Sequence, residues 1–369
     1  MSMRTMIAAI LGVGAFLVCA RFASADEPTR GVYYGSNVFG RQTTTANITG
    51  LLRDTEVNTV IVDKKDDDGR EIAGERFQTI TEPFRKEGAR IMCRIVTLKD
   101  NAYAKKEPGS ALALKSISHP DRIWTDNKGN AYLDPALEGS AEYISDVSIR
   151  AIRDGCDSLN FDYIRLPSGV DGAMKDTKYS SLLADHAAKR RVMQLFLSRM
   201  VTAIRKEYPR VPLAASVFGY ACYGFEPGVG QYLDDFAALG FSISCMAYPT
   251  HYDCNDEAPD PSTAPYKIYH KTGRLAKKYL AEKGYPHAEF IMWLQGFNLM
   301  NINGCGLGTD KNGKTIGIRG KKSPIVDYDH DPVRFREQGR ALDGIGIHSW
   351  LVWHPGARYQ RNLFRPKSP

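Results

Sequence analysis

The sequence predicts an α/β protein built as a single (β/α)₈ TIM barrel, with long βα loops and an irregular eighth helix. Eight short runs rich in β-branched and aromatic residues are spread along the chain. Amphipathic segments of helical period separate them, and several of these end in glycine. Each run is nearly continuously apolar, which is typical of parallel strands covered by helices.

The eight predicted strands follow one another at regular spacing. The first four are Gly31–Asn37, Asn58–Asp66, Arg90–Asp100 and Leu159–Pro167. The second four are Val211–Gly219, Ser242–Pro249, Glu289–Phe297 and Gly346–Pro355. Between them the clearest helical patterns are ANITGLLRDTE, AEYISDVSIRAIRDG, AKRRVMQLFLSRMVTAIRKEY and YKIYHKTGRLAKKYLAEKG.

An open, doubly wound sheet is the alternative arrangement. It would usually carry a glycine-rich turn after its first strand, and GSNVFGRQ does not match the dinucleotide fingerprint. Barrels of this kind typically have about 250 residues, so the longer chain predicts long loops at Asn101–Ser140, Ser168–Asp185, Asp253–Thr263 and Leu299–Val326. Little chain follows the last strand, hence the irregular eighth helix.

The N-terminus has the layout of a secretory signal peptide. Arg4 precedes an apolar segment, Met6–Cys19, and Ala23-Ser24-Ala25 forms a small-residue cleavage site. A membrane anchor would need about 20 apolar residues, and Arg21 interrupts the segment too soon. We expect a signal peptide at residues 1–25, a single barrel domain at 26–369, and export to the periplasm or the medium without membrane insertion.

The charge of the mature chain is mildly basic. Residues 1–25 contain two of the 49 basic residues and no acid, which leaves 47 basic against 42 acidic residues and a net charge of +5. The basic tail Arg358–Lys367 lacks the motif context of nucleic-acid binding, so no nucleic-acid partner is expected. The charge permits an acidic polymer as a partner, and the sequence does not set the oligomeric state.

Six cysteines remain after cleavage, and an even number permits disulfides in an exported protein. Those inside strand-like runs are expected to be buried thiols: Cys93, Cys156 and Cys245. Cys222, Cys254 and Cys305 fall in loops, and Cys254–Cys305 is the preferred disulfide.

No metal or other cofactor is expected. The chain has no Cys-x-x-Cys, His-x-His or His-Glu-x-x-His spacing. KDDDGREIAGE resembles a calcium loop, but Lys64 stands where a ligand aspartate belongs and would repel the cation. GCGLG at Gly304–Gly308 is interpreted as a flexible loop held by Cys305.

Polar side chains gather at the ends of the predicted strands, where barrel enzymes build their sites. They are Asp63, Lys65, Asp66, Arg94, Lys99, Asp100, Asp162, Arg165, Tyr248, His251, Trp293, Gln295, His348, Trp350, Trp353 and His354. Carboxylates, cations and aromatic rings would therefore meet on one rim. That combination suits a sugar, because glycosidic cleavage needs carboxyl groups and flat rings hold pyranoses.

Asp162 is the most informative of these residues. It is the one carboxylate in the apolar stretch LNFDYIRLP, and an ionised group there costs several kcal/mol unless it is paired. It could simply pair with Arg165 or Arg94 to complete a barrel layer. Its place at the end of a strand favours catalysis or ligand binding.

The motifs IVDKKDDDG, WTDNKGNAYLDP, NFDYIRLPSG, SVFGYA, MAYPTHY and WLQGF carry a family resemblance. In order and spacing they resemble a bacterial family of glycoside-hydrolase-like (β/α)₈ barrels long classed as a domain of unknown function. The match runs from Gly31 to Pro355 and is specific through FDYIR-x-P and YP-x-HY together. The resemblance implies a hydrolase acting on polysaccharides, related to retaining α-glycosidases, with Asp162 in the place of the strand-four nucleophile.

A second resemblance fails at one residue. GCDSLNFDYI is similar to the strand-four signature of chitinase-like barrels, in which alternating acids end in a catalytic glutamate. Asp157 and Asp162 match, but Asn160 replaces an aspartate and Ile164 replaces the glutamate. The proton donor must therefore come from elsewhere.

The family pattern also implies an acid on strand five, where this chain has Ser216. A serine cannot protonate a leaving group at neutral pH. Three other carboxyls are candidates: Asp66, Asp134 and Glu226. Lys65 would tend to keep Asp66 ionised, whereas Glu226, in the loop after strand five, is the nearest replacement for a lost strand-five acid.

The sequence thus predicts a hydrolase of polysaccharides or oligosaccharides with Asp162 as nucleophile or charge stabiliser and Glu226 or Asp66 as acid. Substrate contacts are predicted for Asp63, Lys65, Arg94, Asp134, Arg165, Tyr248, His251, Gln295 and Trp353. Ser216 motivates a rival prediction, a catalytically silent sugar-binding barrel. A second carboxyl about 5–5.5 Å from Asp162 would favour a retaining enzyme, and one at about 6.5–9.5 Å an inverting enzyme.

Overall fold

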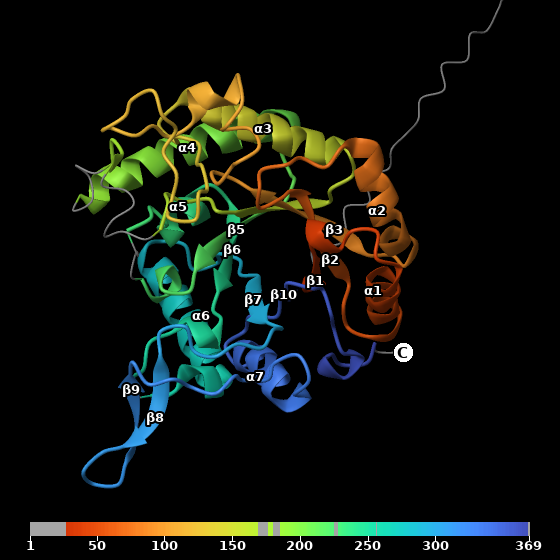
Figure 1. The fold of residues 1–369 in the computed structure, drawn as a ribbon. Helices are drawn as coiled ribbons and strands as arrows, with labels where there is room; N and C mark the ends of the chain where they lie inside the picture. The colour runs from red at the N-terminus through yellow and green to blue at the C-terminus, as the bar shows by residue number, and fades with distance from the viewer. Residues whose placement is uncertain (1–26, 169–175, 180–184, 225–227, 256, 368–369) are drawn as a thin grey trace, which may run out of the picture.

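Eight parallel strands form a closed barrel in the order β1-β2-β3-β4-β5-β6-β7-β10, as the computed structural model shows (Figure 1). It describes residues 27–168, 176–179, 185–224, 228–255 and 257–367. The predicted fold class is confirmed. The strands are β1 (Arg30–Tyr34), β2 (Thr59–Lys65), β3 (Arg90–Val96), β4 (Ser158–Asp162), β5 (Leu213–Phe218), β6 (Phe241–Met246), β7 (Met292–Gln295) and β10 (Trp350–Trp353).

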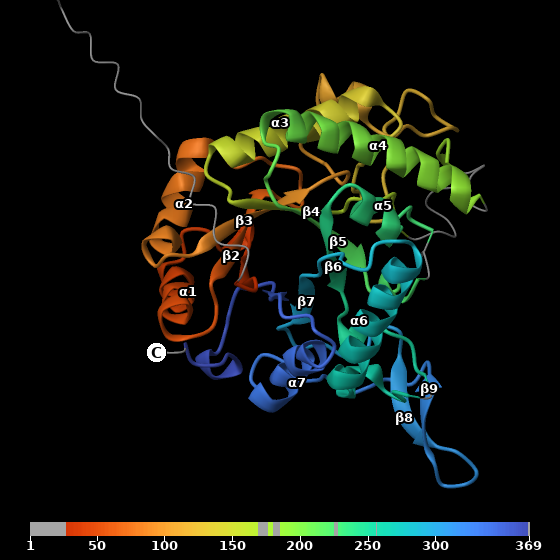
Figure 2. The same ribbon diagram turned by 180° about the vertical axis from the view of Figure 1, so that it is seen from behind.

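Helices surround this ring of strands, as Figures 1 and 2 show from opposite sides. They are α1 (Gln42–Asp54), α2 (Gly74–Lys86), α3 (Glu138–Arg153), α4 (His186–Glu207), α5 (Leu233–Ala238), α6 (Pro265–Glu282) and α7 (Pro332–Asp343). Two of them begin at capping aspartates: the carboxylate of Asp185 accepts the Ala188 amide, and that of Asp331 accepts the Arg334 amide. In the described part of the chain no helix is both long and apolar enough to cross a membrane.

The eighth helix is irregular, as predicted. After β10 the described residues, up to 367, form only a 3₁₀ turn, Arg361–Leu363, and then run beside α1. The Tyr359 hydroxyl takes part in the closure, because it accepts the Tyr33 amide and donates to the carbonyls of Tyr33 on β1 and Val352 on β10, at 2.7 and 3.3 Å. The first and last strands are thereby joined through a buried side chain.

The inward faces of the strands change from apolar to charged along the barrel. An apolar layer in the interior includes Ile61 on β2 and Met92 on β3. Side chains two positions apart on a strand share a face, so Asp63 and Arg94 form the next layer toward the carboxyl ends of these strands. The strand pattern itself therefore places charges at the rim where barrel enzymes carry their sites.

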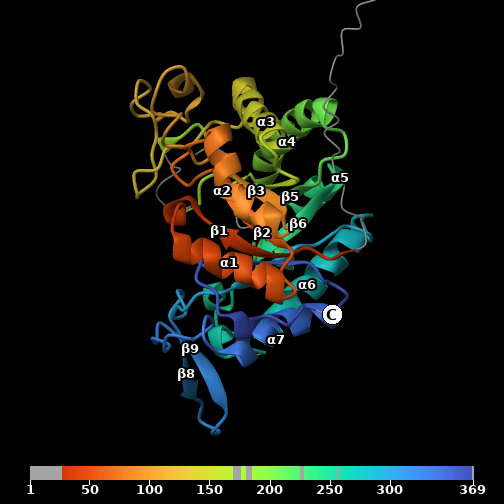
Figure 3. The same cartoon turned by 90° about the vertical axis from the view of Figure 1, so that its right-hand side faces the viewer.

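Two long insertions extend this rim. The segment 97–137 follows β3, and an antiparallel hairpin of β8 (Cys305–Thr309) and β9 (Thr315–Arg319) follows β7. Figure 3 shows both projecting on the same side of the barrel. The expectation of a flexible loop at Gly304–Gly308 was wrong, because the glycines of β8 pair with the β-branched residues of β9.

The expectation of buried thiols at Cys93, Cys156 and Cys245 was also wrong. The structure joins Cys93 to Cys156 and Cys222 to Cys245, with Cα separations of 5.7 and 6.3 Å. Cys93 lies on β3 and Cys156 just before the next strand, β4, whereas Cys245 lies on β6 and Cys222 just after the preceding strand, β5. The parallel pairing of neighbouring strands brings each pair together. The structure also joins Cys254 to Cys305, at a Cα separation of 5.5 Å. The predicted signal peptide, residues 1–25, lies outside the described residues.

Candidate functional site

The guanidinium of Arg94 is the centre of the charged layer. Its Nε and Nη2 donate to Asp162 Oδ2 at 3.0 and 2.7 Å, and its Nη1 donates to Asp63 Oδ1 at 3.0 Å. Nη2 also donates to Asp67 Oδ1 at 3.0 Å. Three carboxylates from the ends of β2 and β4 thus meet on one cation, which we call the Arg94 hub.

Asp63 supports the hub from inside the barrel. Its Oδ2 accepts the Tyr33 hydroxyl at 2.7 Å and the Ser36 amide at 2.9 Å. Burial raises the pKa of Asp63, whereas Arg94, Ser36 and Tyr33 act to lower it. An ionised carboxylate is a pure acceptor, and all of these partners donate. Asp63 therefore fixes the orientation of the guanidinium.

Asp67 lies at the open side of the hub, with 55% of its side chain exposed. Burial of its carboxyl acts to raise the pKa, but Arg94 and then Lys99 outweigh it, and the pKa is lowered. Asp67 and Asp162 bond to the same Nη2 at 3.0 and 2.7 Å, so their oxygens are at most about 5.7 Å apart, the sum of the two lengths. This limit includes the carboxyl separation of retaining glycosidases, about 5–5.5 Å.

Asp162 is held at both carboxylate oxygens and is still reachable. Oδ1 accepts the amide of Tyr163 at 2.7 Å, Oδ2 accepts Arg94, and 16% of the side chain is exposed. Tyr163 has a φ of 49°, in the left-handed region that a bulky residue adopts only at a cost of about 1–3 kcal/mol. The backbone just after β4 is therefore strained at the residue that orients this carboxylate.

Aromatic rings form a wall beside the hub, from the ends of β6, β7 and β10. Phe297 lies 4.9 Å from Trp353 and 5.4 Å from Tyr248 between ring centroids. Burial and the charge of Asp162 raise the pKa of Tyr248, so this ring lies within electrostatic reach of the hub. His251 contacts Tyr248, and burial lowers the pKa of His251 to about 4, which leaves its ring neutral at pH 7.

The strand-five position is part of a buried polar network below the rim. Ser216 Oγ donates to Asn160 Oδ1 at 2.8 Å and accepts Trp293 Nε1 at 2.9 Å. Ser216 is buried. The residue that replaces the family's expected acid therefore joins three strands of the barrel and presents no carboxyl.

Lys65 and Asp66, predicted site residues, have internal partners. Lys65 Nζ pairs with Asp100 Oδ2 at 2.9 Å, and both side chains have 0% exposure. Asp66 Oδ1 accepts the amides of Asp68 and Arg70 and so closes the turn after β2. Both residues anchor loops that surround the hub.

Replacement of Lys65 with methionine is expected to lower the free energy of unfolding by about 3–5 kcal/mol, because Asp100 would be left buried and unpaired. Urea unfolding monitored by circular dichroism measures this loss. Lys64→Met is the matched control. Lys64 is equally buried, but its partners Glu71 and Asp154 keep about a quarter of their side chains exposed and would stay hydrated. Equal losses in the two variants would contradict this account.

Asp134 and Gln295, two other predicted site residues, form their hydrogen bonds away from the hub. Asp134 is buried and accepts the Tyr179 hydroxyl at 2.5 Å. Gln295 is buried and bonds to Thr250 and to the carbonyl of Phe297. Glu226 lies outside the described residues.

Arg165 is stacked between the rings of Tyr163 and Phe218, at 4.7 and 4.6 Å from their centroids. The sequence reasoning overlooked Tyr33, Asp67, Tyr163 and Phe297 as site residues. Asp67 had a usable signal, because DKKDDDG continues past the end of β2 and the loop can turn any of its acids toward the rim. The sequence carried no such signal for Tyr33, because a tyrosine in an apolar strand is indistinguishable from a residue of the hydrophobic core.

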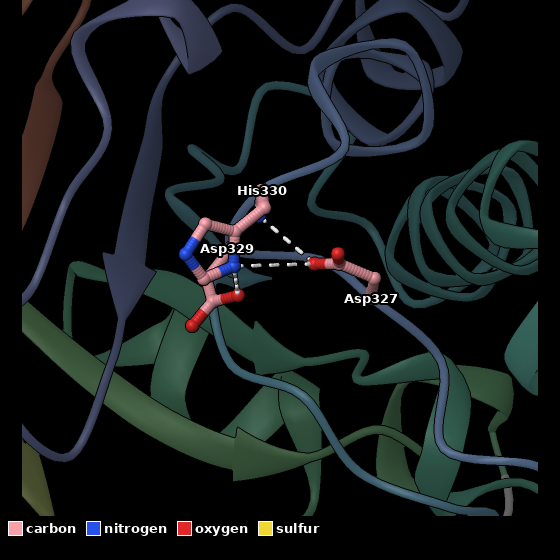
Figure 4. A group of neighbouring side chains, drawn as sticks. All are labelled: Asp327, Asp329 and His330. Carbon is pink, nitrogen blue, oxygen red and sulfur yellow. Dashed lines mark hydrogen bonds and ion pairs between the residues drawn. The ribbon is translucent and has the colours of Figure 1, made fainter.

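A further acidic cluster lies just before α7. Oxygens of Asp327 and Asp329 and Nδ1 of His330 are all within 4.8 Å of one another, and Figure 4 shows the three side chains together. The His330 amide donates to Asp327, and Asp329 also faces His354 Nε2 at 3.5 Å. These contacts tie the segment before α7 to the end of β10.

Comparisons with known proteins identify a family and a shared fold. A family described as "Putative glycosyl hydrolase domain" matches residues 31–311. A search of curated proteins gives no match.

Among solved structures, the glycoside hydrolase domain of PgaB (BpsB) from Bordetella bronchiseptica is 15% identical, with a TM-score of 0.58 over 93% of this chain and 99% of that one. The family GH18 chitinase from Cycas revoluta is 12% identical, with a TM-score of 0.54 over 90% and 97%. The spore cortex-lytic enzyme SleL from Bacillus megaterium is 9% identical, with a TM-score of 0.54 over 92% and 74%. At such identities these likenesses establish a shared fold.

Proposed function

The chain belongs to this glycosyl hydrolase domain family, and from that membership we propose that it hydrolyses glycosidic bonds in a polysaccharide or oligosaccharide, with Asp162 as the nucleophile. The observation that carries the proposal is the Arg94 hub. It gathers three carboxylates at the carboxyl ends of β2 and β4, where barrel enzymes carry their sites. The oxygens of two of them, Asp162 and Asp67, are at most about 5.7 Å apart, a limit that is compatible with the carboxyl spacing of a retaining enzyme, about 5–5.5 Å.

The proposed reaction has two steps. In the first, an oxygen of Asp162 forms a bond to the anomeric carbon while the glycosidic bond breaks, and the leaving oxygen takes a proton from a carboxyl group. In the second, that carboxylate removes a proton from water, which attacks the anomeric carbon and frees Asp162. Arg94 and the Tyr163 amide donate hydrogen bonds to the Asp162 carboxylate and hold its orientation throughout.

Asp67 is our assignment for the carboxyl that gives and takes this proton. Because Arg94 lowers the pKa of Asp67, the protonated form becomes scarcer as the pH rises, and kcat/KM should decline from an acidic optimum toward neutral pH. Asp67→Asn should lower kcat by about 10²–10⁴-fold and remove this decline. A pH–rate profile of both proteins measures it.

The matched control is Asp68→Asn. Asp68 is the exposed neighbour of Asp67, and its one ion pair within the described residues is with an exposed Arg70, so its replacement should leave the profile unchanged. Activity that persists at neutral pH and survives Asp67→Asn would instead assign the proton donor to Glu226.

Sugar binding is proposed for the aromatic wall. Trp353, Tyr248 and Phe297 offer ring faces and edges beside Asp162, and the neutral His251 ring adds a hydrogen-bonding group. Stacked rings bind the apolar faces of pyranoses, and neutral partners avoid a charge that would compete with Asp162. We propose Trp353 as the principal platform residue.

A catalytically silent sugar-binding barrel is the second candidate. It is favoured by one observation: the strand-five position holds the buried Ser216, with Asn160 and Trp293 as partners, in place of an acid. Such a protein would keep the aromatic wall and bind glycans without cleaving them.

Export is part of the proposal. The N-terminal sequence has the layout of a signal peptide. The three disulfides join all six cysteines of residues 26–369, which suits an oxidising compartment such as the periplasm or the medium.

Release of reducing ends from a panel of bacterial and plant polysaccharides tests the proposed function. Wild-type protein is expected to release reducing ends from at least one polymer. Binding of a polymer, measured by calorimetry, without any release would support the silent sugar-binding barrel.

A further inference from the structure

Building on the proposed function, we infer that the glycan carries an anionic substituent, a carboxylate or a sulfate, which Arg165 and Lys99 bind beside Asp162. The inference concerns the class of substrate. It rests on the way in which the charges around β4 are distributed.

Arg165 is a buried cation at the rim. Only 6% of the residue is exposed, and its guanidinium lies between the rings of Tyr163 and Phe218. Among the described residues its one side-chain hydrogen bond runs from Nη1 to the carbonyl of Leu166, at 3.1 Å. Burying a cation costs free energy unless it is paired, and ring stacking offsets only part of that cost.

No described carboxylate pairs with Arg165. Arg94, on the neighbouring strand, takes the nearby acids Asp63, Asp67 and Asp162. The nitrogens that Arg165 leaves without a partner are not sealed inside the protein. Among the described residues, the buried side-chain atoms without a hydrogen-bond partner are Arg30 Nε, Asn47 Oδ1, Ser140 Oγ and Asp260 Oδ2, and no Arg165 nitrogen is one of them. The guanidinium therefore keeps donors that an incoming anion can reach.

Lys99 supplies a second cation at the same place. Its Nζ lies 4.9 Å from the centroid of the Tyr163 ring, and within the described chain it has no ion pair or hydrogen bond. Tyr163 directly follows Asp162 and contacts both cations. Both cations thus contact the ring of Tyr163, the residue whose amide orients the proposed nucleophile.

This arrangement offsets a specific repulsion. Asp162 and Asp67 present negative charge toward the sugar, and an acidic sugar would be repelled unless cations met its substituent. The planar fork of an arginine binds carboxylates and other oxyanions through two parallel hydrogen bonds. A neutral sugar would leave Arg165 without a charged partner, and it would leave Lys99 with the more distant charges of Asp67 and Asp126.

The test is calorimetric binding of matched hexasaccharides to the whole protein. The ligands are hexamers of galacturonate, mannuronate and glucuronate, their carboxyl-reduced neutral counterparts, and those neutral hexamers sulfated at the same position. Wild-type protein is expected to bind at least one anionic hexamer about tenfold more tightly than its neutral counterpart, since one good ion pair is worth about this factor. Whether the carboxylate or the sulfate form binds better identifies the substituent.

Two variants locate the preference. Arg165→Gln should reduce the preference for the anionic hexamer over the neutral one to less than about twofold. Lys99→Gln changes a partly exposed site and leaves the stacked rings in place, and it should divide this preference by about three. Arg274→Gln, an exposed arginine on α6, is the control and should preserve it. Thermal unfolding of each variant shows whether the fold is intact.

The outcomes separate this inference from the proposed function. Equal binding of acidic and neutral hexamers, binding of none, or a preference that survives both variants would overturn the anionic subsite, whatever the reducing-end assay shows. A preference that depends on Arg165 in a protein that releases no reducing ends would uphold the subsite and contradict the hydrolase.

Discussion

Replacing Asp162 with asparagine is expected to lower kcat for glycan hydrolysis by at least about 10³-fold, the scale seen when a catalytic nucleophile is removed. The amide cannot form the glycosyl ester, while its oxygen and the backbone at Tyr163 can keep their places. The free energy of unfolding should change far less than the rate. Initial rates of reducing-end release, measured on the polymer that the wild type cleaves, give the effect.

Asp157→Asn is the matched control for Asp162→Asn. Asp157 precedes β4 at the opposite end of the same strand, where it accepts the Ile91 amide and pairs loosely with Arg85. Its replacement should leave kcat within about twofold, since a surface pair contributes little. If Asp162→Asn kept wild-type activity, Asp162 would be no more than a structural partner of Arg94.

Replacing Arg94 with methionine is expected to reduce activity as strongly and to cost about 3–5 kcal/mol of stability as well, because the buried Asp63 would lose its cation. The orientation of Asp162 would be lost with its two hydrogen bonds from Arg94. Urea unfolding at pH 7 measures the stability, and the rate of reducing-end release measures the activity. Arg150→Met, which breaks an exposed pair with Glu71, should cost less than about 1 kcal/mol.

The free energy of unfolding that Arg94→Met loses should depend on pH in a definite direction. In the wild type the pKa of Asp67 is lowered, so its contribution is present above about pH 3.9 and is lost as the pH falls through the folded-state pKa. Burial raises the pKa of Asp63, which acts in the opposite direction. Without Arg94 the clustered carboxylates repel one another and take up protons more readily when folded. The stability difference between the two proteins should therefore shrink from pH 7 to pH 5, and a constant difference would contradict the hub.

The barrel could be predicted because its strands carry their own signal. Runs such as Asn58–Asp66 and Leu159–Pro167 are apolar on both faces and recur between amphipathic helices, which points to a covered parallel sheet. The β8–β9 hairpin could not be predicted, because three of its strand residues, Gly306, Gly308 and Gly317, are glycines whose pairing depends on the facing strand. Disulfide connectivity likewise depends on which strands are neighbours.

For the candidate site, the sequence predicted which strand ends supply the residues that meet at the rim. Asp63, Arg94 and Asp162 follow from strand ends, because parallel strands bring those ends together. Which acid reaches the hub did not follow, since the turn after β2 directs Asp66 into backbone amides and Asp67 toward Arg94. The strain at Tyr163 and the stacking of Arg165 are also products of tertiary packing.

The most direct test is the site of covalent labelling by a 2-deoxy-2-fluoro glycosyl fluoride of the sugar that the release assay identifies. Such a reagent slows the second step of a retaining glycosidase, so the glycosyl ester accumulates and its peptide can be sequenced by mass spectrometry. We predict one label, on Asp162. Hydrolysis of the natural glycan without a label on Asp162, or with a label on Asp67, would contradict the account.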